Sequence, residues 1–389
     1  MMRAFPPAPE DQVTLANWRT SPFNRWAFHH VREIVPSAEI RNDPSRVRDL
    51  PTGAPLAMPS IESEGETLTF EDFCQKTDTD GMVVLHQGRV IHESYRNGMD
   101  PHAPHILMSV SKSMLGLLAG ILADKGILDL DAEATTYVPE LETTAFKGAT
   151  VRHLLDMRTG VAFDEDYLAT EGPIIEYRKS TNWNPLGPGE SETDLRSFFQ
   201  TLTESHGPHG GKFDYISPCT DLLGWMIERA SGRRYADVFS EFLWRPLGAE
   251  TPAYITVDRL GAPRCAGGLC VTTRDLARVG QMVAEGGWGI VPDAWIDDIA
   301  QNGDPAAWDA STFAPEFPDI PMHYRSKWYV LREQGPILMC LGIHGQNLLI
   351  ERESGLVLAK HASAPTPLDT SGERLTLRLF DKIRRTLGA

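Results

Sequence analysis

Ser109 and Lys112 stand three residues apart at the start of a strongly apolar segment, residues 109–125. That segment has helical spacing, and residues three apart lie on one face of a helix, so the hydroxyl and the amine can meet. An amine that burial keeps neutral near pH 7 can accept the hydroxyl proton and make the serine a nucleophile. The helix N-terminus adds a positive dipole where an oxyanion would form. The pair therefore predicts covalent catalysis by Ser109.

The alternative is that Ser109 and Lys112 are a solvated surface pair, because a Ser-x-x-Lys match alone is a weak signal. Two observations argue against this alternative. Lys112 alone among the nine lysines has a serine three residues before it. A lysine within so apolar a helix is also costly unless it is paired or used.

Tyr215 offers a second group for proton transfer, in Tyr215-Ile216-Ser217 just before another helical segment. A phenol titrates near pH 10 and is a poor base by itself. Beside a lysine ammonium its phenolate is stabilised, and it can then relay protons. The alternative is a loop tyrosine that packs under the glycine-rich turn before it.

The elements that must position these residues are strands at both ends of the chain and helices in the middle. Residues 82–85 and 90–95 predict an antiparallel hairpin with its turn at Gln87-Gly88, and short strand-like runs return after residue 327. A helix begins after the cap-like Thr272, an amphipathic helix closes the chain, and a helix-like piece covers about 25–35. This order predicts an α+β fold, with an antiparallel sheet from both termini and helices on its faces.

We expect two domains with the active site in the groove between them. The sheet domain is discontinuous and takes residues 1–124 and 246–389. The inserted, mainly helical domain takes residues 125–245.

Composition limits the kinds of partner that we expect the protein to bind. Hydrophobic residues make up 41% and charged residues 23%, as in a globular protein with a core. The net charge of -16 repels phosphate backbones and anionic lipid, so nucleic-acid and membrane partners are not expected. The start of the chain does not read as a signal peptide, and no apolar stretch reaches membrane-spanning length. Five scattered cysteines indicate free thiols in a reducing, cytoplasmic compartment.

Several motifs together resemble one family. Ser-x-x-Lys at 109–112, TVRHLLDMRTG at 150–160 and Tyr-x-Ser at 215–217 occur in the order found in class C β-lactamases, D-Ala-D-Ala peptidases and related esterases. The segments HILMSVSKSMLG, SPCTDLLGWMIERASGRRY, GIHGQN and NRWAF further resemble the 6-aminohexanoate-dimer (nylon oligomer) hydrolases and their carboxylesterase relatives. The resemblance implies the β-lactamase/transpeptidase-like fold, a serine hydrolase, and Ser109, Lys112 and Tyr215 as catalytic residues.

The resemblance also implies roles for residues around the catalytic three. Tyr167 matches a loop tyrosine that closes over the scissile amide and donates to its nitrogen. The backbone amides of Ser109 and Ile343 would form the oxyanion hole. Ser217 stands where lactamases usually have asparagine, and it joins Tyr167 and His344 as a candidate substrate-contacting residue. Strand alternation nevertheless turns His344 away from the face that Ile343 presents, which favours a structural role.

The family's Lys/His-Thr-Gly motif is absent. By strand order its place falls at Cys340-Leu341-Gly342, so the usual carboxylate anchor is missing. This puts a β-lactamase or D-amino-acid peptidase activity in doubt. A non-catalytic binding or scaffold protein with the same fold is the alternative of another class.

We therefore expect a serine hydrolase that acts on small-molecule carboxylic esters, and on small linear amides, through an acyl-enzyme on Ser109. No cofactor and no metal are expected, and a homodimer is possible. Glu171 and Glu176 could receive an ammonium-bearing chain, whereas Arg178 would exclude it if it points into the groove. Esters should therefore be cleaved readily, and aminohexanoate-type amides slowly or not at all.

Overall fold

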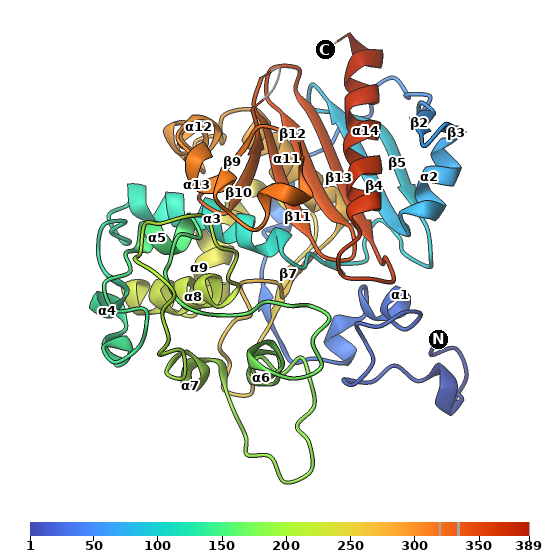
Figure 1. Cartoon of the computed structure of the whole chain (residues 1–389). Coiled ribbons are helices and arrows are strands. Elements are labelled where there is room, and N and C mark those ends of the chain that lie inside the picture. The colour runs from blue at the N-terminus through green and yellow to red at the C-terminus, as the bar shows by residue number, and fades with distance from the viewer. Residues whose placement is uncertain (319, 333–334, 389) are drawn as a thin grey trace.

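The computed structural model describes residues 1–318, 320–332 and 335–388, and its centre is a seven-stranded antiparallel sheet (Figure 1). The strand order is β5-β4-β13-β12-β11-β10-β9, so strands from the first quarter of the chain lie beside strands from the last. The strands are β4 (Thr79–His86), β5 (Arg89–Tyr95), β9 (Met322–Arg325), β10 (Trp328–Leu331), β11 (Ile337–Gly342), β12 (Gln346–Glu351) and β13 (Leu356–Ala362). The predicted fold class, a sheet built from both ends of the chain, is confirmed.

The hairpin of β4 and β5 joins through the predicted turn. Gln87 and Gly88 have φ angles of 49° and 72°, so both central residues are left-handed. A two-residue turn of this kind follows the right-handed twist of the flanking strands. Both strands are longer than the sequence predicted, because β4 is buried along nearly its whole length and lacks a polar alternation that would mark its start.

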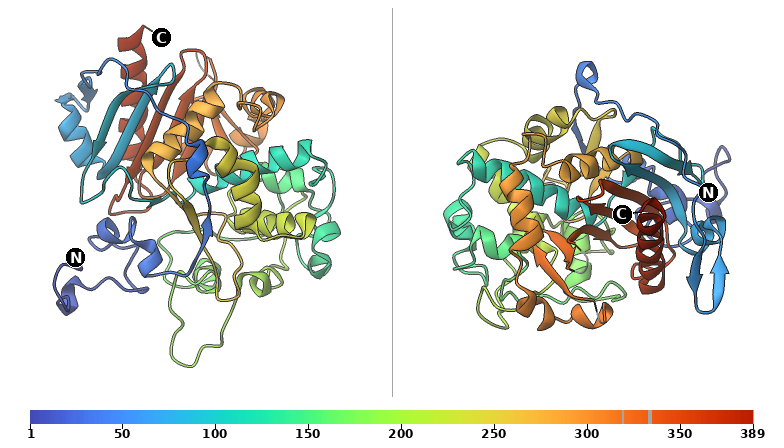
Figure 2. Two further views of the ribbon diagram at one scale, coloured as in Figure 1. Left: turned by 180° about the vertical axis from the view of Figure 1, so that it is seen from behind. Right: turned by 90° about the horizontal axis from the view of Figure 1, so that it is seen from above.

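Helices cover both faces of this sheet. In Figure 1, α14 (Thr370–Leu387) crosses the front of the sheet, and Figure 2 shows α11 (Thr273–Ala284) against the back. α14 buries Leu375, Leu379 and Ile383 on one face, as its amphipathic pattern predicts. Thr272 caps α11 by accepting a hydrogen bond from the Asp275 amide.

The helix that carries the Ser-x-x-Lys pair is α3 (Val110–Asp124). It packs against α8 (Pro218–Ser231) and against strands β10, β11 and β12. Every residue from Val110 to Leu122 is buried, which agrees with a helix that is apolar almost all round. α3 therefore lies between the sheet and the helical part of the chain and presents its N-terminus to the junction.

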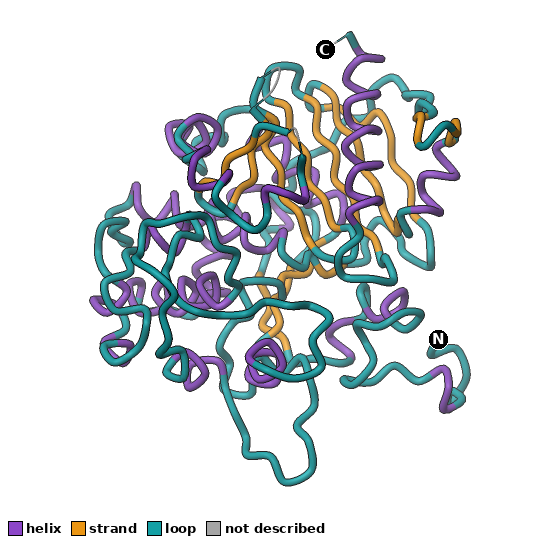
Figure 3. The backbone as a smooth tube through the Cα atoms, viewed as in Figure 1, coloured by secondary structure: helices purple, strands orange, loops and turns teal. Residues whose placement is uncertain are grey.

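Between α3 and β7 (Ala253–Thr256) the chain is mostly helix and loop, with a long loop between α6 and α7 that extends from the molecule in Figure 3. The helices are α4 (Ala134–Tyr137), α5 (Val151–Leu155), α6 (Pro173–Ser180), α7 (Leu195–Phe199), α8 (Pro218–Ser231), α9 (Tyr235–Phe239) and α10 (Arg245–Leu247), with a π-helix at Ser240–Trp244. The division into domains at residues 125 and 245 stays a prediction.

A second sheet of four short strands was not predicted. Its order is β1-β7-β8-β6, and its strands are β1 (Ser37–Ile40), β6 (His105–Ile106), β7 (Ala253–Thr256) and β8 (Leu269–Val271). The remaining elements are β2 (Ile61–Ser63), β3 (Glu66–Leu68), α2 (Phe70–Lys76), α12 (Asp293–Gln301) and α13 (Pro305–Asp309). β6 leads directly into α3, so this sheet helps to fix the position of Ser109.

The predicted helix over residues 25–35 is wrong in extent. The structure has a single turn, α1 (Asn24–Ala27), and then a 3-10 turn at Val31–Glu33. His30, with φ of -131°, breaks the helix between them. The Asn24 side-chain amide donates to the carbonyls of Ser363 and Ala364, so tertiary contacts hold this segment where local propensity alone would continue the helix.

Two further observations concern the whole of the described chain. All five cysteines are buried and none forms a disulfide. Within residues 1–318, 320–332 and 335–388, no helix combines the length and the apolar character needed to cross a bilayer.

Candidate active site

Ser109 lies at the turn where β6 passes into α3. The residue before it, Met108, has φ of 45°, a conformation that non-glycine residues rarely adopt and that tends to mark functional turns. Lys112 Nζ donates to Ser109 Oγ at 2.9 Å and to the Ala266 carbonyl at 2.8 Å. The structure thus brings the hydroxyl and the amine into direct contact, with the amine held from a second side.

The environment of Lys112 disfavours its charged form. Burial lowers the pKa of its amine from 10.5 to about 7, although the nearby Glu165 carboxylate opposes this shift. Arg264 and Lys327 add positive charge nearby and lower the pKa further. Lys327 is itself buried, and its Nζ has no hydrogen-bond partner in the described chain. A substantial neutral fraction of Lys112 therefore exists near pH 7.

Tyr215 is the third member of the group. Lys112 Nζ lies 4.8 Å from the centroid of the Tyr215 ring, and the ring packs on Phe313. Burial and Glu165 raise the pKa of Tyr215 well above its ordinary value, whereas hydrogen bonds with Ser109 and Tyr167 lower it. Tyr215 is thus a protonated phenol that contacts Ser109, which suits a proton relay better than a free base.

Glu165 organises the opposite wall of the site, and the sequence reasoning did not single it out. Its carboxylate accepts hydrogen bonds from the Ser217 amide and hydroxyl and, at 2.7 Å, from the Tyr167 hydroxyl. Ser217 is buried, and Glu165 connects it to the loop that carries Tyr167. Nothing local in the acidic run at 164–166 marks Glu165, because its partner Ser217 is 52 residues away in sequence.

The end of β11 lies against Ser109. A Cβ atom at Gly342 would approach the Leu107 carbonyl oxygen to 2.7 Å and the Ser109 amide nitrogen to 3.1 Å, so only glycine fits this position without a shift. Ile343, the next residue, lines the two cavities beside Ser109. Cys340, two residues before Gly342, is buried within β11.

His344 lines neither of the two cavities beside Ser109. Strand alternation, the reason expected from the sequence, does not explain this. β11 ends at Gly342, so His344 belongs to the following turn, with φ of 63°, and strand alternation does not reach it. Its Nδ1 donates to the Ala364 carbonyl at 2.8 Å and its ring packs on Phe28. Burial lowers the pKa of His344 to about 4, so the ring is a neutral packing element.

Two cavities open on either side of Ser109. The larger, of about 290 Å³, is mostly apolar, and its lining includes Tyr215, Phe313, Phe317, Ile320, Leu341, Ile343, Leu368 and Leu377. The smaller, of about 20 Å³, has a mixed lining, with several charged or polar side chains beside apolar residues such as Met108, Ile174 and Trp183. Ser109, Tyr167 and Ile343 border both, so a substrate carbonyl at Ser109 would have one substituent in each.

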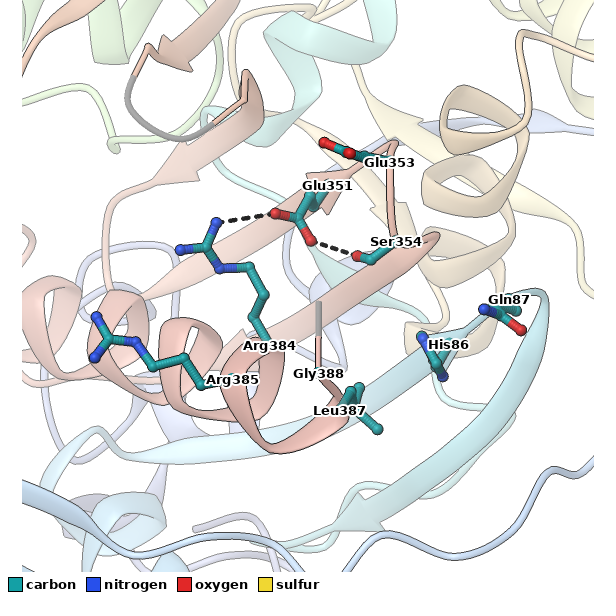
Figure 4. Close-up of a pocket in the computed structure, with 9 residues that line it drawn as sticks. All are labelled: His86, Gln87, Glu351, Glu353, Ser354, Arg384, Arg385, Leu387 and Gly388. Carbon is teal, nitrogen blue, oxygen red and sulfur yellow. Dashed lines mark hydrogen bonds and ion pairs between the residues drawn. The ribbon is translucent and has the colours of Figure 1, made fainter.

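A larger depression of about 810 Å³ lies elsewhere, at the C-terminal end of α14 (Figure 4). Its central carboxylate, Glu351, already accepts hydrogen bonds from Arg384 and Ser354. Arg384 and Arg385 also pair with Asp381, so the charged groups at its centre already have partners. Ser109 lies beside the other end of α14, because the cavity that it lines is also lined by Thr370 and Glu373. In the described chain, no three His, Cys, Asp or Glu side chains are grouped so as to hold a metal ion.

A buried lysine that contacts a serine at a helix N-terminus, with a tyrosine at the same hydroxyl, is the arrangement of a serine hydrolase. Comparison with known proteins agrees with this. Residues 69–380 match the Beta-lactamase family, and the chain belongs to that family. It is 34% identical over 371 residues to the 6-aminohexanoate-dimer hydrolase of Paenarthrobacter ureafaciens, a match that covers 93% of this chain and 91% of the relative.

Further comparisons extend this result. The esterase EstB of Burkholderia gladioli is 26% identical over 156 residues, which cover 39% of this chain and 38% of the esterase. A solved structure from Bacillus anthracis, assigned as a 6-aminohexanoate-dimer hydrolase, has a TM-score of 0.89 at 25% identity and covers 98% of both chains. A family VIII carboxylesterase shares the fold with a TM-score of 0.60 at 14% identity, over 81% of this chain and 95% of its own. The chain is a serine hydrolase of the ester- and amide-cleaving kind.

Proposed function

We propose that this protein cleaves small carboxylic esters, and small linear amides more slowly, through an acyl-enzyme on Ser109. The observation that carries the proposal is the 2.9 Å hydrogen bond between Lys112 Nζ and Ser109 Oγ, at an amine whose pKa burial lowers to about 7. A neutral amine at hydrogen-bonding distance can remove the hydroxyl proton as the oxygen attacks.

In the first half-reaction Ser109 Oγ attacks the carbonyl carbon, and its proton passes to the Lys112 and Tyr215 pair. The negative charge that develops on the carbonyl oxygen is stabilised by hydrogen bonds that the backbone amides of Ser109 and Ile343 donate. In the described chain neither amide donates to another backbone carbonyl, which leaves both free for this role. The leaving alcohol or amine then departs with a proton that Tyr215 delivers.

In the second half-reaction water attacks the acyl-enzyme by the reverse route, and its proton returns through the same pair. The pKa directions favour Lys112 as the proton acceptor and Tyr215 as the relay, since burial holds the first group neutral and the second protonated. Because the two groups are in contact, they titrate together, and the measured pKa values belong to the pair.

The pH dependence tests this assignment. The neutral form of Lys112 is the reactive one, so kcat/KM for a neutral ester should rise with pH through an apparent pKa near 7 and then level off. A pH–rate profile with 4-nitrophenyl butyrate measures it. A profile that is flat between pH 5.5 and 8.5 would contradict a lysine that titrates in this range.

The contacts of Tyr167 favour esters over amides. Its hydroxyl donates to Glu165, so donation to an amide nitrogen requires that this hydrogen bond be broken. An amine leaves poorly unless it is protonated, whereas an alkoxide or phenoxide leaves without such help. Glu171 and Glu176 are exposed, and Glu176 pairs with Lys179, so these carboxylates do not border either cavity beside Ser109.

We expect 4-nitrophenyl butyrate to be cleaved much faster than the linear 6-aminohexanoate dimer. Tyr167→Phe should leave ester turnover within a few-fold of the wild type and lower any amide turnover by about 10²-fold. Steady-state rates on both substrates measure these effects. Dimer hydrolysis that rivals ester hydrolysis, or ester turnover that collapses in Tyr167→Phe, would contradict this account of the loop.

The amide-hydrolase reading is the second candidate, and the 34% identity to the 6-aminohexanoate-dimer hydrolase supports it. The β-lactamase and D-amino-acid peptidase alternatives have weaker support, because the residue in the lysine place, Cys340, is a buried thiol. The scaffold alternative has weaker support because Ser109, Lys112 and Tyr215 are all present and lie together. Nitrocefin turnover tests the first two, and covalent labelling by a fluorophosphonate tests the scaffold alternative. A cytoplasmic location, which the free cysteines favour, and a homodimer stay predictions; light scattering of the purified protein tests the latter.

A further inference from the structure

Three arginines from distant parts of the chain line the small cavity beside Ser109. Arg19 comes from the N-terminal segment, Arg178 from the last turn of α6, and Arg264 from the loop after β7. Arg178 and Arg264 are buried, with 9% and 6% of their surface exposed. The other polar side chains of the lining are those of Ser109, Glu165, Tyr167 and Ser217, and the rest of the wall is apolar: Met108, Ile174, Trp183, Ala266, Gly267 and Ile343.

The arginines are not equally neutralised. Arg264 forms an ion pair with the buried Asp221, and both contact the Tyr177 hydroxyl. Arg178 donates to the backbone carbonyl of Tyr167 at 3.1 Å, and Arg19 donates to the side-chain carbonyl of Asn184. Within the part of the chain that the structure describes, no carboxylate lies within 4.0 Å of either of these two guanidinium groups.

The remaining acidic groups do not remove this excess of positive charge. Glu165 shares the wall, but its oxygens are occupied by Ser217 and Tyr167. Asp166 attracts Arg178 from an exposed position where water screens it. Three cationic side chains therefore meet two close carboxylates, those of Asp221 and Glu165.

Two observations show that the arginines of this wall are incompletely compensated. Burial, together with repulsion from Arg178 and Arg264, lowers the pKa of Arg19 to about 9. In addition, the Nε atoms of Arg19 and Arg264 are buried, and neither has a hydrogen-bond partner in the described chain. Buried donors of this kind are costly, so each of these two guanidinium groups keeps one unsatisfied donor.

A carboxylate is the acceptor that fits. It is planar, it accepts two parallel hydrogen bonds from a guanidinium, and such charge-assisted bonds are stronger than neutral ones. The cavity, of about 20 Å³, exceeds the roughly 10–15 Å³ that a single water needs, so it admits only a small polar group such as the oxygen end of a carboxylate. A phosphate would be larger and an ammonium would be repelled.

We propose that this arginine-lined cavity binds a carboxylate of the substrate, so that the preferred substrates are anionic: half-esters of dicarboxylic acids, or esters of hydroxy acids. Arg19 and Arg178 are the specificity-determining residues, and the apolar cavity on the other side of Ser109 takes the uncharged substituent. The proposal rests on the ester hydrolysis proposed above. It also gives a reason for poor turnover of substrates that carry an ammonium group on this side.

The test compares matched esters that differ in one carboxylate. On the acyl side the pair is the 4-nitrophenyl half-ester of glutaric acid and 4-nitrophenyl pentanoate. On the alcohol side it is 3-carboxyphenyl butyrate and phenyl butyrate. For one of the two pairs, wild-type kcat/KM should favour the anion by at least about tenfold. A neutral preference in both pairs overturns the proposal.

Variants then assign the preference to this wall. Arg19→Gln and Arg178→Gln should each lower the ratio of anionic to neutral kcat/KM by about tenfold, and Arg19→Lys should retain part of it. Arg41→Gln is the matched control, because it removes one positive charge from a side chain that is 84% exposed and should leave the ratio unchanged. A ratio that stays at the wild-type value in both glutamine variants overturns the proposal.

A binding measurement separates this proposal from the proposed function. In a Ser109→Ala background, calorimetry should detect glutarate binding, and Arg19→Gln should weaken that binding by about tenfold. Weakened glutarate binding without ester turnover by the wild type would refute the proposed function and support the carboxylate site. Ester turnover with glutarate binding that Arg19→Gln does not change would do the reverse.

Discussion

Ser109→Ala is expected to lower kcat/KM for 4-nitrophenyl butyrate by about 10³-fold or more, because the alanine side chain cannot form the acyl-enzyme. What remains would come from the oxyanion-stabilising amides and from substrate binding. The same variant should lose covalent labelling by a fluorophosphonate. Initial rates and mass spectrometry of the labelled protein measure the two effects.

Ser113→Ala is the matched control for this prediction. Ser113 is also buried on α3, but its hydroxyl donates to the Lys327 carbonyl at 2.7 Å and not into the site. Its loss should cost about 1 kcal/mol of stability and should leave labelling at Ser109 intact. Near-wild-type turnover in a folded Ser109→Ala protein would refute the mechanism.

Lys112→Ala and Tyr215→Phe are each expected to lower kcat/KM by about 10²-fold or more, and the double variant should lose far less than the product of the two. The physical reason is that the two groups handle the same proton. Lys112 is in contact with Ser109 Oγ and also lies over the Tyr215 ring, so removal of either one disables the pair. A double-mutant cycle on ester hydrolysis measures the coupling.

Losses that multiply fully in the double variant would show that Lys112 and Tyr215 act separately. Stability has to be followed at the same time, because Lys112 is 2% exposed and its replacement leaves the Ala266 carbonyl without its donor. Lys112→Met keeps the volume of the side chain and removes the amine. It should show the same loss of turnover if the amine, and not packing, is what the reaction needs.

Local pattern was enough to predict the catalytic helix and its neighbours. The spacing of Ser109 and Lys112, the cap at Thr272 and the turn at Gln87-Gly88 are each decided within four residues of chain, and the structure has all three. The same reasoning missed β1 and β6 to β8, because these strands are two to four residues long and are stabilised by partners far along the chain.

The residues that form the walls of the site could not be predicted, because they too depend on partners far along the chain. The roles of Glu165 and Arg264 depend on contacts with Ser217 and Asp221, which are 52 and 43 residues away in sequence. Arg19 contacts Asn184 across 165 residues. Arg178 was singled out in sequence, but its direction depended on where the loop at Tyr167 folds, which no periodicity encodes. The sequence thus predicted which residues meet at Ser109, and packing determines what surrounds them.

The N-terminal segment has a consequence for how selectivity is inherited. Trp18 is fully buried, donates to the Trp183 carbonyl at 3.1 Å and thereby seats Arg19 beside the site, yet both residues precede the family's span of 69–380. The proposed nucleophile and the charge proposed to face the substrate are thus encoded in separable stretches of the gene. Exchange of the first 30 or so codons between homologues would recombine the two, and would transplant one enzyme's charge preference onto another's unchanged catalytic centre.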